Sequence, residues 1–148
     1  MITYFCLHKH LKGVIYHMEK TLVLIKPDAV ERNYVGKILG LYEENGLKIV
    51  DLKMLTATEE LAKKHYAEHV EKPFFPELLT YITRSPIVAL ILEGENAIAK
   101  VREINGSTDP KEAAEGTVRN LYAVSKSENS VHASDSAESA EREMTIWF

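Results

Sequence analysis

The stretch that decides the fold is Thr21-Leu22-Val23-Leu24-Ile25-Lys26-Pro27-Asp28-Ala29-Val30. Its first five residues are β-branched or apolar, which is typical of a β-strand. The strand ends at Pro27, because proline has no N–H for the next bond of a sheet, and Asp28 can cap a following helix. The sequence therefore predicts a strand that leads into a turn and a helix, with Lys26 at the junction.

Strand and helix patterns alternate through the rest of the chain. Ile87 to Leu92 is continuously apolar, as expected of a central strand buried on both faces. The other expected elements are a helix from Val35 that stops at Asn45-Gly46, a strand over 47–55, a helix capped by Thr58, an elbow at Pro73-Phe74-Phe75-Pro76, a helix through Leu79 and Ile82, a helix over 97–104, a strand over 131–133 and a helix opening at 134–136. This order favours an α/β (α+β) fold, specifically a ferredoxin-like split βαβ sandwich in which helices cover a four-stranded antiparallel sheet.

Local signals add detail to two of these elements. The alternation of residues 47–55 slips between Ile49 and Val50, which predicts either a β-bulge or a strand that changes face. Asp135 and Glu138 have the spacing of a capping box. The helix that they open carries an apolar stripe formed by Ala137, Ala140, Met144 and Trp147.

Composition bounds the kind of protein. The chain has 148 residues, of which 45% are hydrophobic, so it suits one compact domain with a buried core. Its 18 basic and 22 acidic residues give a net charge of -4, which argues against nucleic acid or an anionic membrane as the main ligand. No apolar run approaches the roughly 18–20 residues that cross a bilayer, and the single Cys6 cannot form an internal disulfide. We expect a cytoplasmic protein.

The first residues do not have the pattern of a targeting signal. Residues 1–17 lack both the apolar region and the small-residue cleavage site of a signal peptide. Met18 directly precedes the first strand pattern. We expect residues 1–17 to be an extension of the domain formed by residues 18–148, and one hypothesis is that translation begins at Met18.

Two patterns could bind a metal. His65-Tyr66-Ala67-Glu68-His69 fits the H-x-x-E-H arrangement, which would place two histidines on one face of a helix. No third ligand is identifiable, so a partly exposed helix with incidental histidines is the favoured interpretation. A second group lacks paired CxxC spacing and carries little weight; it consists of Cys6, His8, His10 and His17.

A third candidate is His132, which lies before a helix start rich in oxygen-bearing side chains. A neutral imidazole is mostly unprotonated at pH 7 and can act as a nucleophile. Taken alone, a buried histidine beside a capped helix explains the pattern equally well. The functional interpretation requires that phosphate-binding side chains from elsewhere converge on His132. Those available are Lys26, Arg102, Thr108 and Arg119.

The common nucleotide-binding and kinase motifs are missing from the sequence. It contains no G-x-x-x-x-G-K-[ST], no G-x-G-x-x-G, no G-x-S-x-G and no protein-kinase signature set. A nucleotide site in this chain must therefore be built differently.

Five blocks occur in order along the chain: residues 21–30, His65-Tyr66 with Pro73-Phe74-Phe75, Asn105-Gly106 through Thr108-Asp109-Pro110, Gly116-Thr117-Val118-Arg119, and residues 129–143. Together they resemble the nucleoside diphosphate kinase family, over a region that runs from about Thr21 to Phe148. A chance match of five motifs in the same order and at compatible spacings is very improbable.

The resemblance implies a mechanism. In that family the histidine of the N-x-x-H-x-S-D-S signature is the nucleophile, which implies that His132 becomes a pros-phosphohistidine. A nucleoside triphosphate, typically ATP, would phosphorylate His132 and leave as the diphosphate, and a second nucleoside diphosphate would then accept the group in a ping-pong reaction. Glu143, together with Ser134, would orient the imidazole. The phosphates or the reacting centre would be contacted by Lys26, Tyr66, Arg102, Thr108 and Arg119.

The resemblance also implies how the rest of the nucleotide binds. Lys26 and Asn129 would reach the sugar hydroxyls, and Phe74 would lie against the base as a stacking surface that accepts every base. Leu78 would also belong to the nucleotide-binding residues. Mg²⁺ would be bound by phosphate oxygens, with no direct protein ligand. The chain would form a homo-oligomer, a tetramer or a hexamer.

Two other classes of protein remain as alternatives. A catalytically silent or regulatory module of the same fold could bind nucleotides or nucleic acid, since fold does not fix function. The matched positions, His132 and Glu143 among them, argue against a silent relative. A zinc hydrolase would use His65 and His69, and metal analysis of the purified protein distinguishes it.

Overall fold

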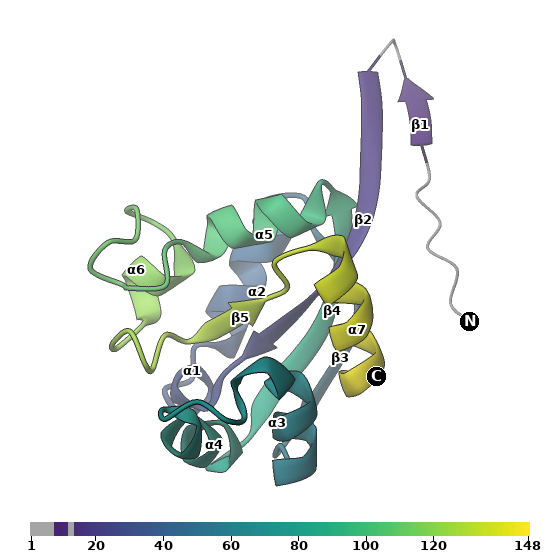
Figure 1. The fold of residues 1–148 in the computed structure, drawn as a ribbon. Helices are drawn as coiled ribbons and strands as arrows, with labels where there is room; N and C mark the ends of the chain where they lie inside the picture. Colours follow the sequence, from purple (N-terminus) through teal and green to yellow (C-terminus); the bar gives the residue numbers. More distant parts are fainter. Residues whose placement is uncertain (1–7, 12–13) are drawn as a thin grey trace.

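The computed structural model describes the backbone of residues 8–11 and 14–148 and the side chains from His17 onward. Among these residues, no helix is both long and apolar enough to cross a membrane. The strands are β1 (His8–Leu11), β2 (Val14–Ile25), β3 (Lys48–Leu55), β4 (Ile87–Glu95) and β5 (Val131–Ala133) (Figure 1). The helices are α1 (Pro27–Glu31), α2 (Val35–Glu44), α3 (Glu59–His65), the 3-10 helix η1 (Ala67–His69), α4 (Phe75–Thr83), α5 (Ala97–Asn105), α6 (Val118–Tyr122) and α7 (Ala137–Trp147).

A sheet forms the centre of the fold. β5, β2, β4 and β3 lie side by side in that order, and each neighbouring pair is antiparallel. β1 pairs with the opposite end of β2 from β5, and the resulting hairpin projects from the helices in Figure 1. The predicted ferredoxin-like arrangement of a four-stranded antiparallel sheet with helices is thus confirmed.

Two hydrophobic cores lie on the two faces of the sheet. Because side chains alternate along a strand, Val23 and Ile25 of β2 enter one core, whereas Leu22 and Leu24 enter the other. The first core is covered by residues of α2, α5 and α6. The second is covered by residues of α3, α4 and α7. The strand Thr21 to Ile25 is therefore buried on both faces, which fits its almost wholly apolar sequence.

The predicted elements correspond to the observed ones, with two corrections near β2. The strand begins at Val14 rather than at Thr21, because its first residues pair with β1 and the next ones pair with the end of β4. Asp28 does not cap α1. The N-cap position is occupied by Lys26 without a side-chain bond, and Asp28 lies inside the helix with its carboxylate buried.

The predicted bulge and helix stop are confirmed. The pairing of β3 with β4 shifts between Ile49 and Asp51, so Val50 is the extra residue. α2 ends at Glu44, and Gly46 has a φ of 80°, which suits the left-handed end of a helix. Phe74 is half exposed immediately before α4, as expected for the elbow.

Hydroxyl groups cap three of the helices that carry functional residues: α3, α7 and α6, the last through Thr117. The Thr58 Oγ1 accepts a hydrogen bond from the backbone N of Leu61 at 3.1 Å, as predicted for α3. The prediction for α7 was wrong by one residue. Ser136, not Asp135, is the cap, and its Oγ accepts from the backbone N of Ser139 at 3.1 Å.

The inner face of α7 also differs in part from the predicted stripe. Ala140, Met144 and Trp147 face inward, but Ala137 is exposed. Glu143 lies on this inner face and is buried, although a lone glutamate in an apolar stripe is unfavourable unless its oxygens accept hydrogen bonds. Its surroundings are therefore of interest for function.

The cap of α3 provides a test of the fold. Thr58→Ala removes the bond to the N-terminus of α3 and should lower the free energy of unfolding by about 1 kcal/mol. Thr56→Ala is the matched control, because Thr56 is exposed and precedes the helix. Urea unfolding of both variants measures the difference. An equal loss in the two variants would contradict the capping role.

Candidate functional site

β5 places His132 in the sheet. His132 is its middle residue and pairs with Leu24 of β2. Val131 and Ala133 belong to the core on one face, so strand alternation turns His132 to the other face, beneath α3 and α7. Its side chain remains 23% exposed, and the ring is therefore accessible from a cavity.

The buried carboxylate of Glu143 orients the His132 ring. Its Oε1 lies 2.7 Å from Nε2 of His132, and its Oε2 accepts a hydrogen bond from the hydroxyl of Ser134. An ionised carboxylate only accepts hydrogen bonds. The proton of neutral His132 therefore lies on Nε2, which leaves the lone pair of Nδ1 available.

His65 lies directly behind this pair. Its ring packs edge-on against His132, with centroids 4.5 Å apart. Nε1 of Trp147 donates to Nδ1 of His65 at 3.1 Å, so the proton of His65 lies on Nε2, 3.8 Å from Oε1 of Glu143. Burial, and then the proximity of His132, hold the pKa of His65 far below its ordinary value. His65 is thus a neutral ring at physiological pH.

The pKa of His132 is also lowered, and burial is the main cause. The hydrogen bond and the charge of Glu143 act in the opposite direction, whereas Lys26 and Arg119 lower the pKa further. His132 is therefore neutral near pH 7, which is the form that can attack an electrophile.

Lys26 lies immediately after β2 and is largely buried. Its Nζ donates a hydrogen bond to Oδ1 of Asn129 at 2.9 Å. Burial, reinforced by the positive charge of Arg119, lowers the pKa of Lys26 to about 8, while Asp28 partly opposes the shift. A buried ammonium group next to a second cation is well suited to bind an anion.

Arg119 of α6 is held by two backbone carbonyls. It donates to the oxygens of Gly106 and Val131, in each case at 2.8 Å, and its buried Nε has no hydrogen-bond partner. Gly106 has a φ of 83°, and a Cβ there would lie 2.5 Å from Oγ1 of Thr117. Only glycine fits at this position. The close approach of Gly106 to Thr117 places the carbonyl of Gly106 where it accepts from the Arg119 guanidinium.

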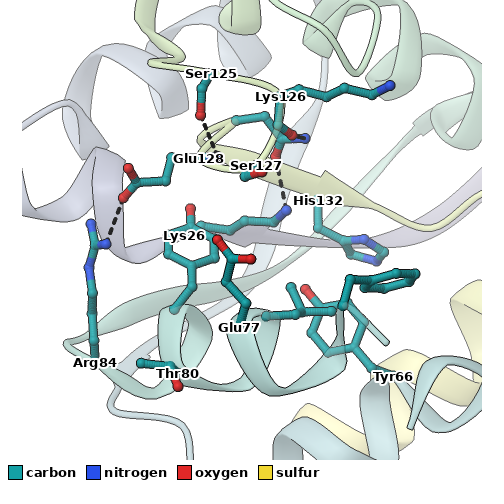
Figure 2. Close-up of a pocket in the computed structure, with 14 residues that line it drawn as sticks. Lys26, Tyr66, Glu77, Thr80, Arg84, Ser125, Lys126, Ser127, Glu128 and His132 are labelled. Carbon is teal, nitrogen blue, oxygen red and sulfur yellow. Dashed lines mark hydrogen bonds and ion pairs between the residues drawn. The ribbon is translucent and has the colours of Figure 1, made fainter. Parts of the chain in front are cut away.

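Two cavities meet at His132. The larger, of about 810 Å³, extends from His132 along α4 toward the loop before β5, as Figure 2 shows. The smaller, of about 330 Å³, lies on the side of α5, α6 and α7. The sequence-predicted residues divide between them: Phe74 and Leu78 line the larger, Arg102, Thr108, Arg119 and Glu143 line the smaller, and Lys26, Tyr66, Asn129 and His132 line both.

The two cavities have different chemical character. The smaller one is lined by four cationic side chains and three carboxylates: Lys26, Arg102, Arg119 and Arg142, with Glu68, Asp135 and Glu143. In the larger one, Phe74 presents an aromatic ring that is 50% exposed. Ser134 lines neither cavity but lies buried behind Glu143. The site thus suits a ligand with an anionic part and a planar apolar part, joined near His132.

Comparison with known proteins identifies the family. The family model described as nucleoside diphosphate kinase matches residues 19–148. A nucleoside diphosphate kinase of Clostridium perfringens is 61% identical over 131 residues, which are 88% of this chain and 92% of that protein. The chain belongs to the nucleoside diphosphate kinase family.

More distant relatives agree. The nucleoside diphosphate kinase of Pyrococcus abyssi is 55% identical over 133 residues, covering 88% of this chain and 84% of that protein. A crystal structure of the Aquifex aeolicus nucleoside diphosphate kinase superposes with a TM-score of 0.86 at 45% identity, covering 88% of this chain and 95% of that one. The protein is therefore a nucleotide-binding enzyme, a kinase that makes nucleoside triphosphates from diphosphates.

The zinc-hydrolase interpretation does not fit a nucleoside diphosphate kinase of this geometry. α3 ends at His65, and His69 lies in η1, so the two histidines do not share one face of a helix. His69 is only partly buried, and its Nδ1 lies 2.9 Å from Nζ of Lys72. His65, His132 and Glu143 do have their ligand atoms within 4.8 Å of one another. However, Nε2 of His65 carries a proton, and Oε1 of Glu143 is bonded to His132, so these atoms are not free to act as a set of metal ligands.

The second predicted metal cluster lies almost wholly outside the described residues. Cys6 and the side chains of His8 and His10 are not described. Only His17 is, at the exposed end of β2.

Sequence reasoning missed several residues of the site. His65 was noted in a metal pattern and in one of the five blocks but was given no role in the site, and Trp147 was noted in an apolar stripe. Together they form the back wall behind His132. Asp28 and Ser130 were noted without their mutual hydrogen bond. The only signal in the sequence was their position beside Lys26 and His132.

Proposed function

We propose that this kinase works by a ping-pong mechanism in which Nδ1 of His132 carries the phosphoryl group. The observation that carries the proposal is the 2.7 Å contact between Oε1 of Glu143 and Nε2 of His132. This contact occupies one ring nitrogen and leaves the other with its lone pair in the cavity. Orientation of an imidazole by a carboxylate is an established way to prepare it for reaction.

The first half-reaction moves one phosphoryl group. A bond forms between Nδ1 of His132 and the terminal phosphorus of a nucleoside triphosphate, while the bond from that phosphorus to the bridging oxygen breaks and the diphosphate leaves. The proton on Nε2 stays in place, so the phosphorylated ring gains positive charge beside the Glu143 carboxylate. The second half-reaction reverses these steps with another nucleoside diphosphate in the same cavity.

The cations of the smaller cavity support this chemistry. Phosphoryl transfer depends mainly on in-line positioning and on stabilisation of the phosphate oxygens. We assign that role to Lys26, Arg102, Thr108 and Arg119, with the buried hydroxyl of Tyr66 at the reacting centre. Arg119 is held rigidly by its two carbonyl partners, so it needs little reorganisation when a nucleotide binds.

The larger cavity fits the nucleoside. Phe74 and Leu78 line it and would contact the base, while Asn129, already bonded to Lys26, lies where a sugar hydroxyl can be reached. Stacking on an aromatic ring holds the face of a base and needs no specific hydrogen bonds to the edge of the base. We therefore expect the enzyme to accept many nucleotides.

Mg²⁺ enters this proposal as part of the substrate, bound to the phosphates of the nucleotide. Carboxylates are the protein ligands that Mg²⁺ prefers. Glu143 is already committed to His132 and Ser134. The surroundings of His132 are thus consistent with a metal that is held by phosphate oxygens.

Formation of the phosphoenzyme tests the proposal. Incubation with Mg·ATP alone should add one acid-labile phosphoryl group, and a nucleoside diphosphate other than ADP should then remove it, as intact mass measures. His132→Ala should abolish both steps, because the nucleophile is lost. His17→Ala is the control, since His17 lies outside both cavities. An unmodified wild-type protein would favour a silent binding module instead.

The pKa of Lys26 predicts an alkaline limit. Because burial lowers this pKa to about 8, Lys26 loses its charge as the pH rises through that value, and attraction of phosphate weakens. kcat/KM for Mg·ATP reports groups of the free enzyme, so it should fall above about pH 8. Lys26→Arg keeps the charge at high pH and should move this limit upward. A limit that stays in place would assign it to another group.

The proposal extends to a homo-oligomer, a tetramer or hexamer, with β3 in an interface. Only one edge of β3 is paired within the described residues, and Val50, Leu52 and Met54 of this strand are exposed. An apolar edge strand is a common contact between subunits. Sedimentation velocity should show the oligomer, and Leu52→Glu should reduce its size. A monomeric wild-type protein would exclude it.

We also propose a cytoplasmic location. Its support is the single cysteine, Cys6, which excludes an internal disulfide of the type common in exported proteins. Cell fractionation with an antibody to the protein measures it.

A further inference from the structure

Ser130 has an unusual backbone conformation two residues before His132. It is fully buried, and its φ is 70°, a region that residues with a side chain rarely occupy. The backbone N of Val131 donates to the oxygen of Asn129 at 2.9 Å across it. An i to i+2 bond around a positive φ defines a strained γ-turn. We call residues 129–131 the Ser130 turn.

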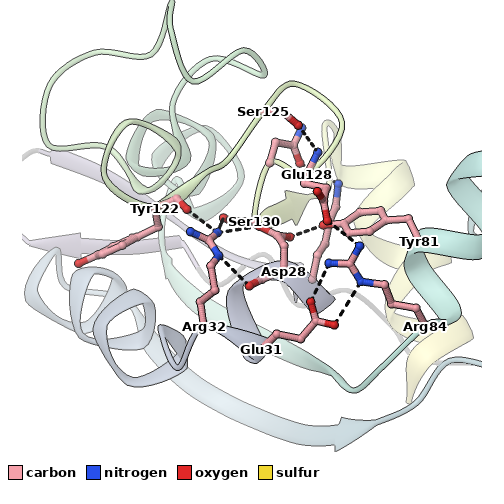
Figure 3. A network of polar contacts seen from close by, with 11 residues as sticks. Asp28, Glu31, Arg32, Tyr81, Arg84, Tyr122, Ser125, Glu128 and Ser130 are labelled. Atoms are coloured by element: carbon pink, nitrogen blue, oxygen red, sulfur yellow. Dashed lines mark hydrogen bonds and ion pairs between the residues drawn. The ribbon is translucent and has the colours of Figure 1, made fainter.

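Asp28 holds the side chain at the centre of this turn. Oδ2 of Asp28 accepts a hydrogen bond from the Ser130 hydroxyl at 2.9 Å and one from Arg32 at 3.0 Å, while Oδ1 accepts one from the hydroxyl of Tyr81. Figure 3 shows these side chains converging on the carboxylate from different elements. Asp28 is only 2% exposed, so its charge depends on these donors rather than on water.

The same segment of chain also holds the backbone of the turn. The backbone N of Lys26 donates to the oxygen of Ser130 at 2.8 Å. The side-chain hydroxyl of Ser130 is therefore hydrogen-bonded to Asp28, and its backbone carbonyl to Lys26. The turn connects Asn129, whose side chain accepts from Lys26, to the strand that carries His132.

We propose that Asp28 is a positioning residue for phosphoryl transfer, which holds the Ser130 turn in its strained form and so fixes Asn129 and His132 relative to Lys26. This inference rests on the proposed function, because it concerns the same reaction at His132. Strained backbone persists only where its surroundings over-determine it, and it gathers at functional sites. Asp28 lines neither cavity, and its hydrogen bond to Ser130 is its direct contact with the turn. Its charge also raises the pKa of Lys26, so the test must separate that effect from the effect on the turn.

Arg32 does not account for the placement of Asp28. Arg32 and Asp28 lie four residues apart and would form an ion pair on the surface of α1 without Ser130 or Tyr81. Instead the carboxylate is buried toward β5, and Arg32 follows it to reach the oxygens of Tyr122 and Asp28. The position of the Asp28 carboxylate is therefore explained by its contact with the Ser130 turn rather than by its ion pair with Arg32.

The test compares substitutions that remove the hydrogen bond with substitutions that remove the strain. Asp28→Asn removes the charge and one accepting oxygen of the carboxylate and so weakens the bond, whereas Ser130→Ala removes the bond; both variants keep a Cβ at the positive φ. The rate of phosphorylation by saturating Mg·ATP, measured by rapid quench, should fall by roughly a hundredfold for either, as expected for a small misplacement of reacting groups. Ser130→Gly also loses the bond, but glycine adopts a positive φ freely, so its rate should exceed that of Ser130→Ala at least about tenfold.

The double variant Asp28→Asn with Ser130→Gly is the decisive comparison. If Asp28 acts by holding the turn, glycine should restore most of the rate lost in Asp28→Asn, although the melting temperature stays low. Asp28→Asn with Asn96→Gly is the matched control. Asn96 also has a positive φ, 47°, but lies at the start of α5 outside both cavities, and its change should restore nothing.

The outcomes separate the inference from the proposed function. A wild-type protein that gains no phosphoryl group would overturn both. A phosphorylated wild type, with Asp28→Asn equally fast or with no recovery by Ser130→Gly, would overturn only the role of Asp28. If Asp28→Asn fails to fold, the comparison of Ser130→Ala with Ser130→Gly still decides, because equal rates in those two variants would contradict the inference.

Discussion

The site depends on the pairing of β5 with β2 over only three residues. Val23, Leu24 and Ile25 lie opposite Ala133, His132 and Val131. This pairing brings together two parts of the chain that are more than a hundred residues apart in sequence, and it continues beyond the strands in the bond from Lys26 to Ser130. The cation that follows β2 and the imidazole on β5 are neighbours because of it. A slip of one residue would turn His132 into the opposite core.

The buried carboxylates and the buried cations of the site differ in their hydrogen-bond partners. Each buried carboxylate has several donors: Asp28 accepts from Arg32, Ser130 and Tyr81, and Glu143 accepts from His132 and Ser134. Lys26 and Arg119, by contrast, have only neutral hydrogen-bond partners in the described part of the chain. Burying a cation without an anion is unfavourable. A bound polyphosphate would place negative charge beside these two cations, so their burial favours phosphate binding.

The sequence predicted most of the fold, for local physical reasons. The apolar runs of β2 and β4 need two covered faces, and the phase slip at Ile49 and Val50 indicates a bulge or a change of face from the local sequence alone. Signals that depend on competition between neighbours were less reliable. Asp135 and Ser136 both have side chains that can cap α7. The path of the backbone between β5 and α7 decides which of them occupies the N-cap position. Residues of the site were predicted through a family resemblance, because convergence of distant cations on one histidine leaves no local pattern.

His65 shows why its role could not be read from the sequence. Its spacing to His69 is that of a zinc pair, but α3 ends at His65 and the ring turns inward. There Trp147 fixes the proton on Nε2, and burial keeps the ring neutral. In the proposed mechanism a neutral neighbour favours phosphorylation of His132, because that ring would gain positive charge 4.5 Å from His65. A charged His65 would oppose this step, and it would compete with His132 for the single carboxylate of Glu143.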